Sequence, residues 1–311
     1  MNIGFFLLFF TILFFPLTAA NIKPFLKPCP DKSDNNKMAE IDFIYMINLD
    51  ERPEKFAESK KQLEPYHITP YRFSAVNGWK LPLEDIGKLA LYIEPWMDNS
   101  MMGTRYPLEN KGEPLHERIQ PGKSYFSHCM SRGAIGIVLS QLSVLEDAYK
   151  SGYGTIWVME DDIEVIKNPN KLSDYIRQLD ALVGKENWDI LFTDPDTKNR
   201  EGSYVPCLSY AKRPNFSPSN PEKFAIRKNI SPTFDKIHAR YGTYSAIIRR
   251  SGIKKIRRFF RQNGVFLPYD MEFYLSNKIN LYTLNFDVIS TLPKALSDNE
   301  GPNYERKNLP N

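Results

Sequence analysis

Short apolar runs alternate with amphipathic or charged stretches over most of this chain. Apolar runs of strand length lie at residues 43–47 and 155–159, and we predict further strands over residues 71–76 and 188–193. The stretches between them predict helices over residues 54–63, from 131 to the glycines at 152 and 154, and over 172–183. The first strand, helix and strand make one βαβ unit. The alternation predicts an α/β fold with a central, mostly parallel sheet.

The C-terminal half repeats this alternation less clearly. We expect a strand over residues 243–248, a helix over 251–263, and a final pair of strands at 281–286 and 288–291. Two long segments, 81–123 and 198–236, show no clear period and are rich in proline. We predict that both are long loops, which in compact domains are commonly functional or mobile.

Both ends of the chain differ from this pattern. Residues 1–20 contain a run of Phe, Leu and Ile followed by Thr18-Ala19-Ala20, which is typical of a secretory signal peptide, although no basic residue precedes the run. The run is also near the lower length limit for a membrane anchor, so both alternatives stay open. Either leader indicates the secretory pathway or the cell envelope. Residues 21–40 predict a linker, 41–295 the folded domain and 296–311 a polar tail.

Acidic residues gather where the predicted strands end. Residues 155–159 stop at three consecutive carboxylates, Glu160-Asp161-Asp162, which repel one another by roughly 1 kcal/mol per pair even in water. Asp194 and Asp196 follow the next strand along the chain, which we expect to be its neighbour in the sheet, and Asp270 follows a later apolar stretch. Ligands bind at the carboxyl edge of open α/β sheets, so the pattern favours a cation site there. The alternative is a solvated acidic turn.

Composition narrows the chemistry. A net charge of +4 over 311 residues is too small to indicate nucleic-acid binding. The three cysteines and four histidines are scattered, without the spacings of a zinc site. No glycine-rich phosphate loop is present either. Mg²⁺ or Mn²⁺, which take oxygen ligands and bridge to phosphates, therefore fit the acidic loop best, and a nucleotide-diphosphate sugar is a ligand that this arrangement would hold.

Several motifs resemble those of a known family, in the same order. They are Ile47-Asn48-Leu49-Asp50-Glu51-Arg52-Pro53, Ala75-Val76-Asn77-Gly78, Gly133-Ala134-Ile135-Gly136 with Ser140, and Met159-Glu160-Asp161-Asp162. A later stretch, Gly242 to Ile248 followed by Asp270, is similar to the closing strand, helix and aspartate of the same family. Each motif is weak alone. The ordered set resembles glycosyltransferase family 25, which includes lipooligosaccharide β-galactosyltransferases of lipopolysaccharide biosynthesis and procollagen galactosyltransferases.

The resemblance implies a GT-A type, Rossmann-like nucleotide-sugar-binding fold, a UDP-sugar donor with galactose as the expected hexose, Mn²⁺ or Mg²⁺, and inversion at the sugar carbon. It also implies that Glu160 and Asp162 bind the metal, with Asp161 adjacent. Inversion needs a general base, for which Asp270 is the first candidate and Asp194 the second. The residues expected to border the nucleotide are Asn48, Leu49, Arg52, Asn77 and Gly78.

Two positions depart from the family pattern. The family usually has an acidic residue where Ala134 stands, and a Ser-His pair where Ser140-Gln141 stands. Loss of a carboxylate and an imidazole could change the donor sugar or remove activity, so a non-catalytic binding or adhesion protein is the main alternative. A secreted metal-dependent phosphohydrolase also explains paired acidic strand ends, but it would normally contain more histidine.

The expected partners are the UDP-sugar donor and a saccharide or glycoprotein acceptor, with no nucleic acid. Basic residues crowd one face of the predicted helix 251–263. That face is either an ordinary solvated surface or a contact with an anionic membrane, to which the N-terminal apolar segment would add.

Overall fold

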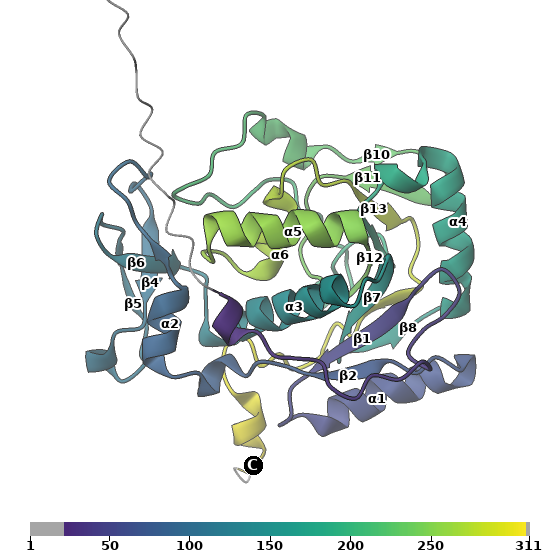
Figure 1. The fold of residues 1–311 in the computed structure, drawn as a ribbon, viewed down its shortest axis with the longest axis horizontal. Coiled ribbons are helices and arrows are strands. Elements are labelled where there is room, and N and C mark those ends of the chain that lie inside the picture. The colour runs from purple at the N-terminus through teal and green to yellow at the C-terminus, as the bar shows by residue number, and fades with distance from the viewer. Residues whose placement is uncertain (1–21, 309–311) are drawn as a thin grey trace, which may run out of the picture.

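Three layers, helices on both faces of one large sheet, form the body of the protein. The computed structural model describes residues 22–308, shown in Figure 1. Its main sheet has the strand order β10-β11-β13-β9-β12-β7-β1-β2. The strands are β1 (Phe43–Asn48), β2 (Tyr71–Ser74), β7 (Thr155–Glu160), β9 (Ile190–Phe192), β10 (Lys228–Asn229), β11 (Phe234–Ile237), β12 (Ser245–Arg249) and β13 (Leu281–Leu284). Of these strands, β11 and β12 run against the others, so the sheet is mostly parallel by strand direction.

Side chains of the central strands alternate between two cores, because successive residues of a strand point to opposite faces. In β1, Phe43 and Tyr45 share a core with helices α3 and α5, whereas Ile44 and Met46 share a core with α1 and α4. Every β1 residue is buried, which explains the apolar run in the sequence. The four helices are α1 (Pro53–Leu63), α3 (Arg132–Lys150), α4 (Leu172–Val183) and α5 (Arg250–Asn263).

These elements confirm the predicted α/β class, and β1, α1 and β2 form the expected parallel βαβ unit. Helix α3 begins after Ser131, whose Oγ accepts a hydrogen bond from Ala134 N at 2.9 Å and so caps the helix. One expected neighbour relation is wrong. β12 lies between β7 and β9 and runs antiparallel to both, so a strand separates the two acidic strand ends.

The segment 81–123, predicted to be a loop, contains regular structure. A short helix, α2 (Leu83–Leu89), precedes an antiparallel sheet in the order β3-β6-β4-β5, which lies beside the main body in Figure 1. Its strands are β3 (Leu91–Tyr92), β4 (Met102–Arg105), β5 (Leu115–Arg118) and β6 (Ser124–Ser127). Strands this short give too few positions for alternation to show in the sequence.

The final strands also differ from the expected pair. β13 joins β9 and β11 in the main sheet. β14 (Ile289–Thr291) instead pairs with β8 (Ile163–Val165), the strand that follows the acidic loop. The end of the predicted loop 198–236 also contributes to the main sheet, through β10 and β11. The last strand of the fold therefore returns to the acidic loop.

The segments expected to be a linker and a tail both pack on the domain. In the expected linker, Cys29 is buried and Lys27 N donates to Ser143 Oγ of α3 at 2.9 Å, so this segment belongs to the fold. In the expected tail, residues 297–304 fold back against the sheet edge. The apolar leader lies outside the described residues. Within the described part of the chain, no helix is long and apolar enough to cross a bilayer.

The basic face of α5 is partly engaged inside the protein. Lys255 Nζ pairs with Asp189 at 2.6 Å, and the buried Arg257 pairs with Glu146 at 2.5 Å. These two basic side chains are therefore not free to form the solvated or membrane-contacting surface that the sequence suggested.

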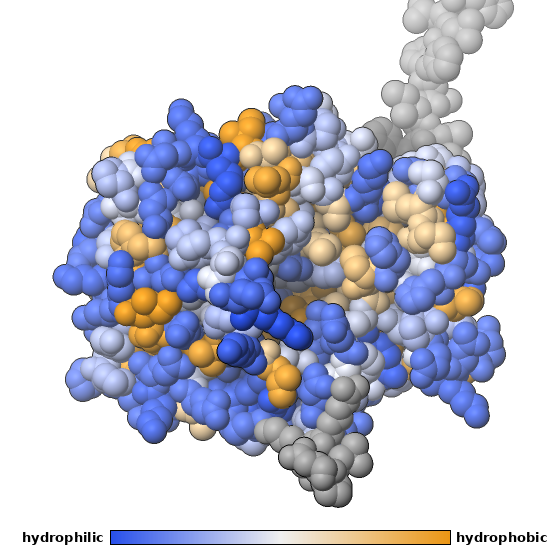
Figure 2. Space-filling model, turned by 180° about the vertical axis from the view of Figure 1, so that it is seen from behind, coloured by the Kyte–Doolittle hydropathy of each residue, from blue (hydrophilic) through white to orange (hydrophobic). Residues whose placement is uncertain are grey.

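On the face turned away in Figure 1, hydrophobic side chains lie in separate patches on a largely hydrophilic surface (Figure 2).

Candidate active site

The acidic loop begins inside the main sheet. Glu160 is the last residue of β7, and its N–H donates to Tyr244 O at 2.9 Å. Asp161 and Asp162 form the turn that leads to β8. Asn48 Nδ2, at the end of β1, donates to Asp161 Oδ2 at 2.6 Å. The ends of two parallel strands and the residue that precedes β12 therefore hold the three carboxylates at the carboxyl edge of the sheet.

Asp270 joins this cluster from the other half of the chain. It lies in the short helix α6 (Tyr269–Glu272), and its Oδ2 accepts a hydrogen bond from Gly242 N at 3.0 Å. Burial, followed by repulsion from the loop carboxylates and from Asp270, raises the pKa of Glu160 to about 8. Burial also raises the pKa of Asp270. The fold thus brings the predicted metal pair and the first candidate base into one site.

The cluster has the properties of a cation site that a ligand completes. Asp162 Oδ1 is buried and has no hydrogen-bond partner in the described part of the chain. The contacts to Glu160 Oε1 are long, 3.5 Å from Gln141 Nε2 and 3.3 Å from Thr243 Oγ1. Among residues 22–308, no three Asp, Glu, His or Cys side chains are grouped to hold a metal by themselves. Glu160 and Asp162 fit a Mg²⁺ or Mn²⁺ ion whose other ligands come from phosphates and water.

A pocket opens beside this cluster, between the sheet edge and helix α3. Its wall includes Leu49 after β1, Asn77 and Gly78 after β2, and Lys55 of α1. Gly78 is required here because a Cβ atom would lie 1.8 Å from Arg132 O of α3. The wall therefore contains three of the residues predicted to border the nucleotide, together with all three loop carboxylates.

The C-terminal segment (residues 297–304) covers this pocket. Asp298 forms an ion pair with Arg52 in which both side chains are buried, and its carbonyl accepts a hydrogen bond from Trp79 Nε1 at 2.8 Å. With the segment in place the cavity is about 100 Å³, smaller than the roughly 300 to 1,000 Å³ of ordinary ligand pockets. In this position of the segment the cavity is too small for a nucleotide sugar.

Three of the residues predicted to border the nucleotide have partners within the protein. Asn48 is buried, and its amide donates to Arg52 O at 2.8 Å as well as to Asp161, so it orients the acidic loop. The Arg52 guanidinium is held by the C-terminal segment. Asn77 Nδ2 donates to Tyr304 Oη at 3.0 Å. The C-terminal segment thus engages two side chains for which the resemblance implies a nucleotide partner.

Asp194, the second candidate base, lies in a different environment from Asp270. Its side chain is fully buried, and its carboxylate accepts hydrogen bonds from Arg240, Tyr244 and Ser290. A general base must come within hydrogen-bond reach of the acceptor hydroxyl, and this carboxylate has no exposed surface with which to do so. The geometry therefore favours Asp270 as the base. The bonds of Asp194 to its buried neighbours are those of a residue that supports the structure.

Several residues of the site were not predicted from the sequence. Lys55 lines the pocket, and its Nζ lies 3.9 Å from a carboxylate oxygen of the acidic loop. Gly242 and Thr243 contact the carboxylates of Asp270 and Glu160. The sequence contained a signal for Gly242 and Thr243, because they begin the family-like stretch before β12. It contained no signal for Lys55, which is one of several lysines on a charged helix.

The two departures from the family pattern lie at different places. Gln141 Nε2 is 3.5 Å from both Glu160 Oε1 and Thr243 Oγ1, so the side chain that stands where the family has an imidazole contacts the predicted metal pair. Ala134 is buried in the first turn of α3, next to Gly133, which lines the pocket. Of the two departures, the one at Gln141 changes a group that touches the acidic cluster.

Comparison with known proteins identifies the family. The model of glycosyltransferase family 25 (LPS biosynthesis protein) matches residues 41–271, a span that includes the acidic loop and Asp270. The chain belongs to glycosyltransferase family 25. Its mixed α/β fold with a mostly parallel sheet agrees with a Rossmann-like glycosyltransferase fold.

A family 25 relative from Mus musculus is named inactive glycosyltransferase 25 family member 3. It is 23% identical over 161 residues, which cover 52% of this chain and 23% of the mouse protein. The aligned part is therefore about a quarter of that relative's length. Because this relative is named inactive, membership of family 25 does not by itself establish transfer activity.

The raised pKa of Glu160 predicts how the stability of the metal-free protein depends on pH. The folded-state pKa, about 8, lies above the ordinary value of 4.5, so the folded protein binds more protons than the unfolded chain between these values. We expect the free energy of unfolding to fall as the pH rises through this window. Urea unfolding in EDTA at about pH 5 and about pH 8 measures the change.

Glu160→Gln should remove much of that pH dependence, because the amide does not titrate. Glu186→Gln, at an exposed position, is the matched control and should leave it unchanged. Equal pH dependence in the wild type and in Glu160→Gln would contradict the raised pKa of Glu160 in the folded protein.

Proposed function

We propose that this family 25 protein is an inverting, metal-dependent glycosyltransferase that moves a hexose from a UDP-sugar to a saccharide or glycoprotein acceptor. The proposal is carried by the cluster of Glu160, Asp162 and Asp270 beside a pocket at the carboxyl edge of the sheet. Galactose is the proposed hexose, on the strength of the family resemblance. The apolar leader supports a place in the secretory pathway or at the cell envelope.

The carboxylates have separate roles in this reaction. Glu160 and Asp162 would hold Mn²⁺ or Mg²⁺, which when bound stabilises negative charge on the leaving diphosphate. Lys55 adds positive charge on the same wall of the pocket. Asn48 orients the acidic loop through its hydrogen bond to Asp161.

Asp270 is the proposed general base. Burial raises its pKa toward neutral pH, which suits a group that must take a proton from an acceptor hydroxyl. The hydrogen bond from Gly242 N fixes the orientation of its carboxylate. Its place beside the metal pair would let it reach an acceptor bound next to the donor sugar.

A donor screen tests the proposal. Purified protein is incubated with a panel of UDP-hexoses and Mn²⁺, Mg²⁺ or EDTA, and released UDP is measured with and without saccharide and glycoprotein acceptors. We expect release that requires the metal and rises with acceptor, fastest with UDP-galactose. Equal release in EDTA contradicts the metal role, and no release with any donor contradicts the transferase.

A non-catalytic binding protein is the second candidate, favoured by the Gln141 departure beside Glu160 and by the inactive relative. Such a protein would bind UDP with the metal but would not turn over. Calorimetry on the same samples distinguishes the two. Metal-dependent UDP binding without turnover across the panel favours the binding protein, and no UDP binding at all contradicts both.

The C-terminal segment should compete with the donor for the pocket. Asp298→Ala removes the ion pair to Arg52, so we expect Mn²⁺-dependent UDP binding to tighten by about tenfold, because more of the protein is in the open state. Calorimetric titration with UDP measures the effect. Glu300→Ala, at an exposed position of the same region, is the control. Weaker binding by Asp298→Ala would show instead that the segment assists the donor.

A further inference from the structure

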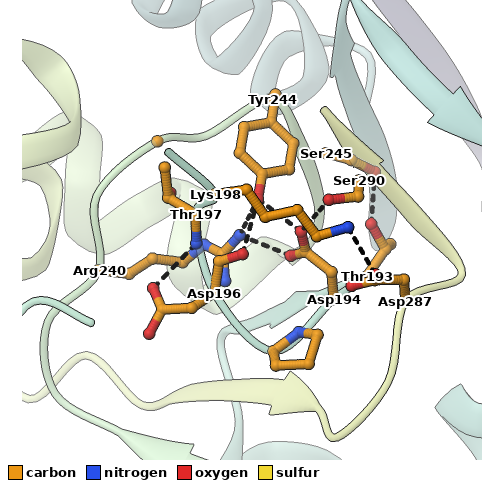
Figure 3. Close-up of polar contacts among 12 residues, drawn as sticks. Thr193, Asp194, Asp196, Thr197, Lys198, Arg240, Tyr244, Ser245, Asp287 and Ser290 are labelled. Atoms are coloured by element: carbon orange, nitrogen blue, oxygen red, sulfur yellow. Dashed lines mark hydrogen bonds and ion pairs between the residues drawn. The ribbon is translucent and has the colours of Figure 1, made fainter. Parts of the chain in front are cut away.

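A buried ionic network lies next to the proposed site. Asp194, directly after β9, and Arg240 are both fully buried, and they form an ion pair. The same carboxylate accepts hydrogen bonds from Tyr244 Oη and, at 2.9 Å, from Ser290 Oγ of β14. Figure 3 shows these side chains pointing toward one another around Asp194. Segments far apart in the sequence are thereby joined at one carboxylate.

This network is a costly way to fill a core. Burying two charges is stabilising only when both are well satisfied, and apolar side chains often serve a core as well or better. Arg240 Nε and Nη1 have no hydrogen-bond partner in the described part of the chain. Its guanidinium carbon lies 4.6 Å from the ring centroid of Phe192 and 5.4 Å from that of Tyr244, which compensates in part. An incompletely satisfied buried pair points to a role beyond packing.

The network holds both ends of a short segment that reaches the proposed site. We call this segment, residues 240–244, the brace. Gly242 N donates to Asp270 Oδ2 at 3.0 Å, and Thr243 Oγ1 donates to Glu160 Oε1 at 3.3 Å. The carbonyl of the last brace residue accepts the N–H of the same glutamate at 2.9 Å. The brace thus contacts both the proposed base and one proposed metal ligand.

The shape of the brace is fixed at its centre. Gly242 has a φ of 70°, which residues other than glycine adopt only with strain. A Cβ atom at this position would lie 2.7 Å from Thr197 Oγ1. That hydroxyl donates to Tyr241 O. The backbone around Gly242 therefore has little freedom to move its N–H away from Asp270.

We propose that Asp194 is a positioning residue that anchors the brace and so places both carboxylates of the proposed site. One arm of the brace, Thr243, orients Glu160 for the cation. The other arm, Gly242, orients Asp270 for the acceptor. This inference rests on the proposed function and deepens it. It requires that the two arms affect different measured quantities. The Thr243 arm should affect cation and donor binding, and the Gly242 arm should affect turnover.

Two substitutions separate the arms. Thr243→Val removes the hydroxyl and keeps the shape, so the Mn²⁺-dependent affinity for UDP should weaken by about tenfold while kcat at saturating metal changes little. Gly242→Ala displaces the N–H that holds Asp270, so kcat should fall by about tenfold while the KM for the donor is unchanged. Matched controls are Thr233→Val, outside the network, and Gly87→Ala, where an added Cβ meets nothing within 4 Å.

The anchor is tested by Asp194→Asn, which keeps the shape of the side chain and should weaken both quantities. If that variant does not fold, Tyr244→Phe removes one hydrogen bond to the anchor and keeps the ring. Thermal melting of every variant accompanies the assays. Losses of the same size in binding and turnover in both arm variants, or losses that simply follow the melting temperature, would overturn the positioning role.

The wild-type protein is measured first, so that a failure of the proposed function is recognised separately. Binding of Mn²⁺ and UDP without turnover excludes the transferase activity. The proposed role of Thr243 is then tested by binding alone. A wild type that binds neither ligand overturns both proposals. A wild type that binds and turns over, with arm variants that match the controls, overturns the brace and leaves the proposed function in place.

Discussion

Asp162→Asn is expected to abolish Mn²⁺-dependent UDP binding while the fold is retained. The substitution removes the negative charge whose Oδ1 oxygen lacks a partner in the described part of the chain, and loss of a direct ligand should cost more than the roughly 10- to 100-fold of an outer-shell change. It also relieves repulsion within a half-buried acidic cluster. The melting temperature of the metal-free variant should therefore be equal to or higher than that of the wild type. Calorimetry with Mn²⁺ and UDP, and thermal melting in EDTA, measure both effects.

Asp174→Asn is the matched control for this experiment. Asp174 lies on the exposed side of α4, where it pairs with Lys171 and Arg177 at the surface. Exposed pairs of this kind contribute little to stability. Metal-dependent binding by the control should equal that of the wild type. Full binding by Asp162→Asn would show that the acidic loop does not hold the cation.

Asp270→Asn should reduce turnover by about 10²- to 10⁴-fold, the usual contribution of a positioned acid–base group. The amide oxygen can still accept the hydrogen bond from Gly242 N, so the local structure should be kept. Metal-dependent UDP binding should change little, because the substitution leaves Glu160 and Asp162 in place. Steady-state kinetics on the best donor, with calorimetry on the same preparation, separates the two quantities.

A parallel Asp194→Asn variant distinguishes the base from the positioning residue. For Asp270→Asn we expect loss of turnover with normal UDP binding. For Asp194→Asn we expect both turnover and UDP binding to weaken. If instead turnover survives Asp270→Asn and is lost with normal binding in Asp194→Asn, the roles of the two carboxylates are reversed.

The central sheet was predictable because its strands are buried on both faces. Residues 43–47 and 156–159 are continuously apolar, and both belong to strands of the sheet interior. The capped helix α3 was marked by its apolar stripe. The small sheet β3-β6-β4-β5 was not predicted, because its strands are short and it is held by antiparallel pairing between segments that lack a period. Local pattern does not encode pairing of that kind.

The candidate site shows the same division. Glu160 and Asp162 are adjacent in sequence to a buried strand, so their place at its carboxyl end followed directly. Asp194 also follows a strand. However, the spacing of residues could not show that β12 is inserted beside β7, or that Asp194 is buried against Arg240. Its acidity was visible, and its environment was not.

The sequence alone determined the α/β class, the βαβ unit, the acidic end of β7 and the family, because these depend on local periodicity and on ordered motifs. The tertiary structure decided which distant groups meet. It brought Asp270 to Glu160, folded residues 297–304 over the pocket, and buried Asp194 against Arg240. The physical reason is that burial and charge proximity, which set the chemistry of a carboxylate, are properties of packing between segments far apart along the chain.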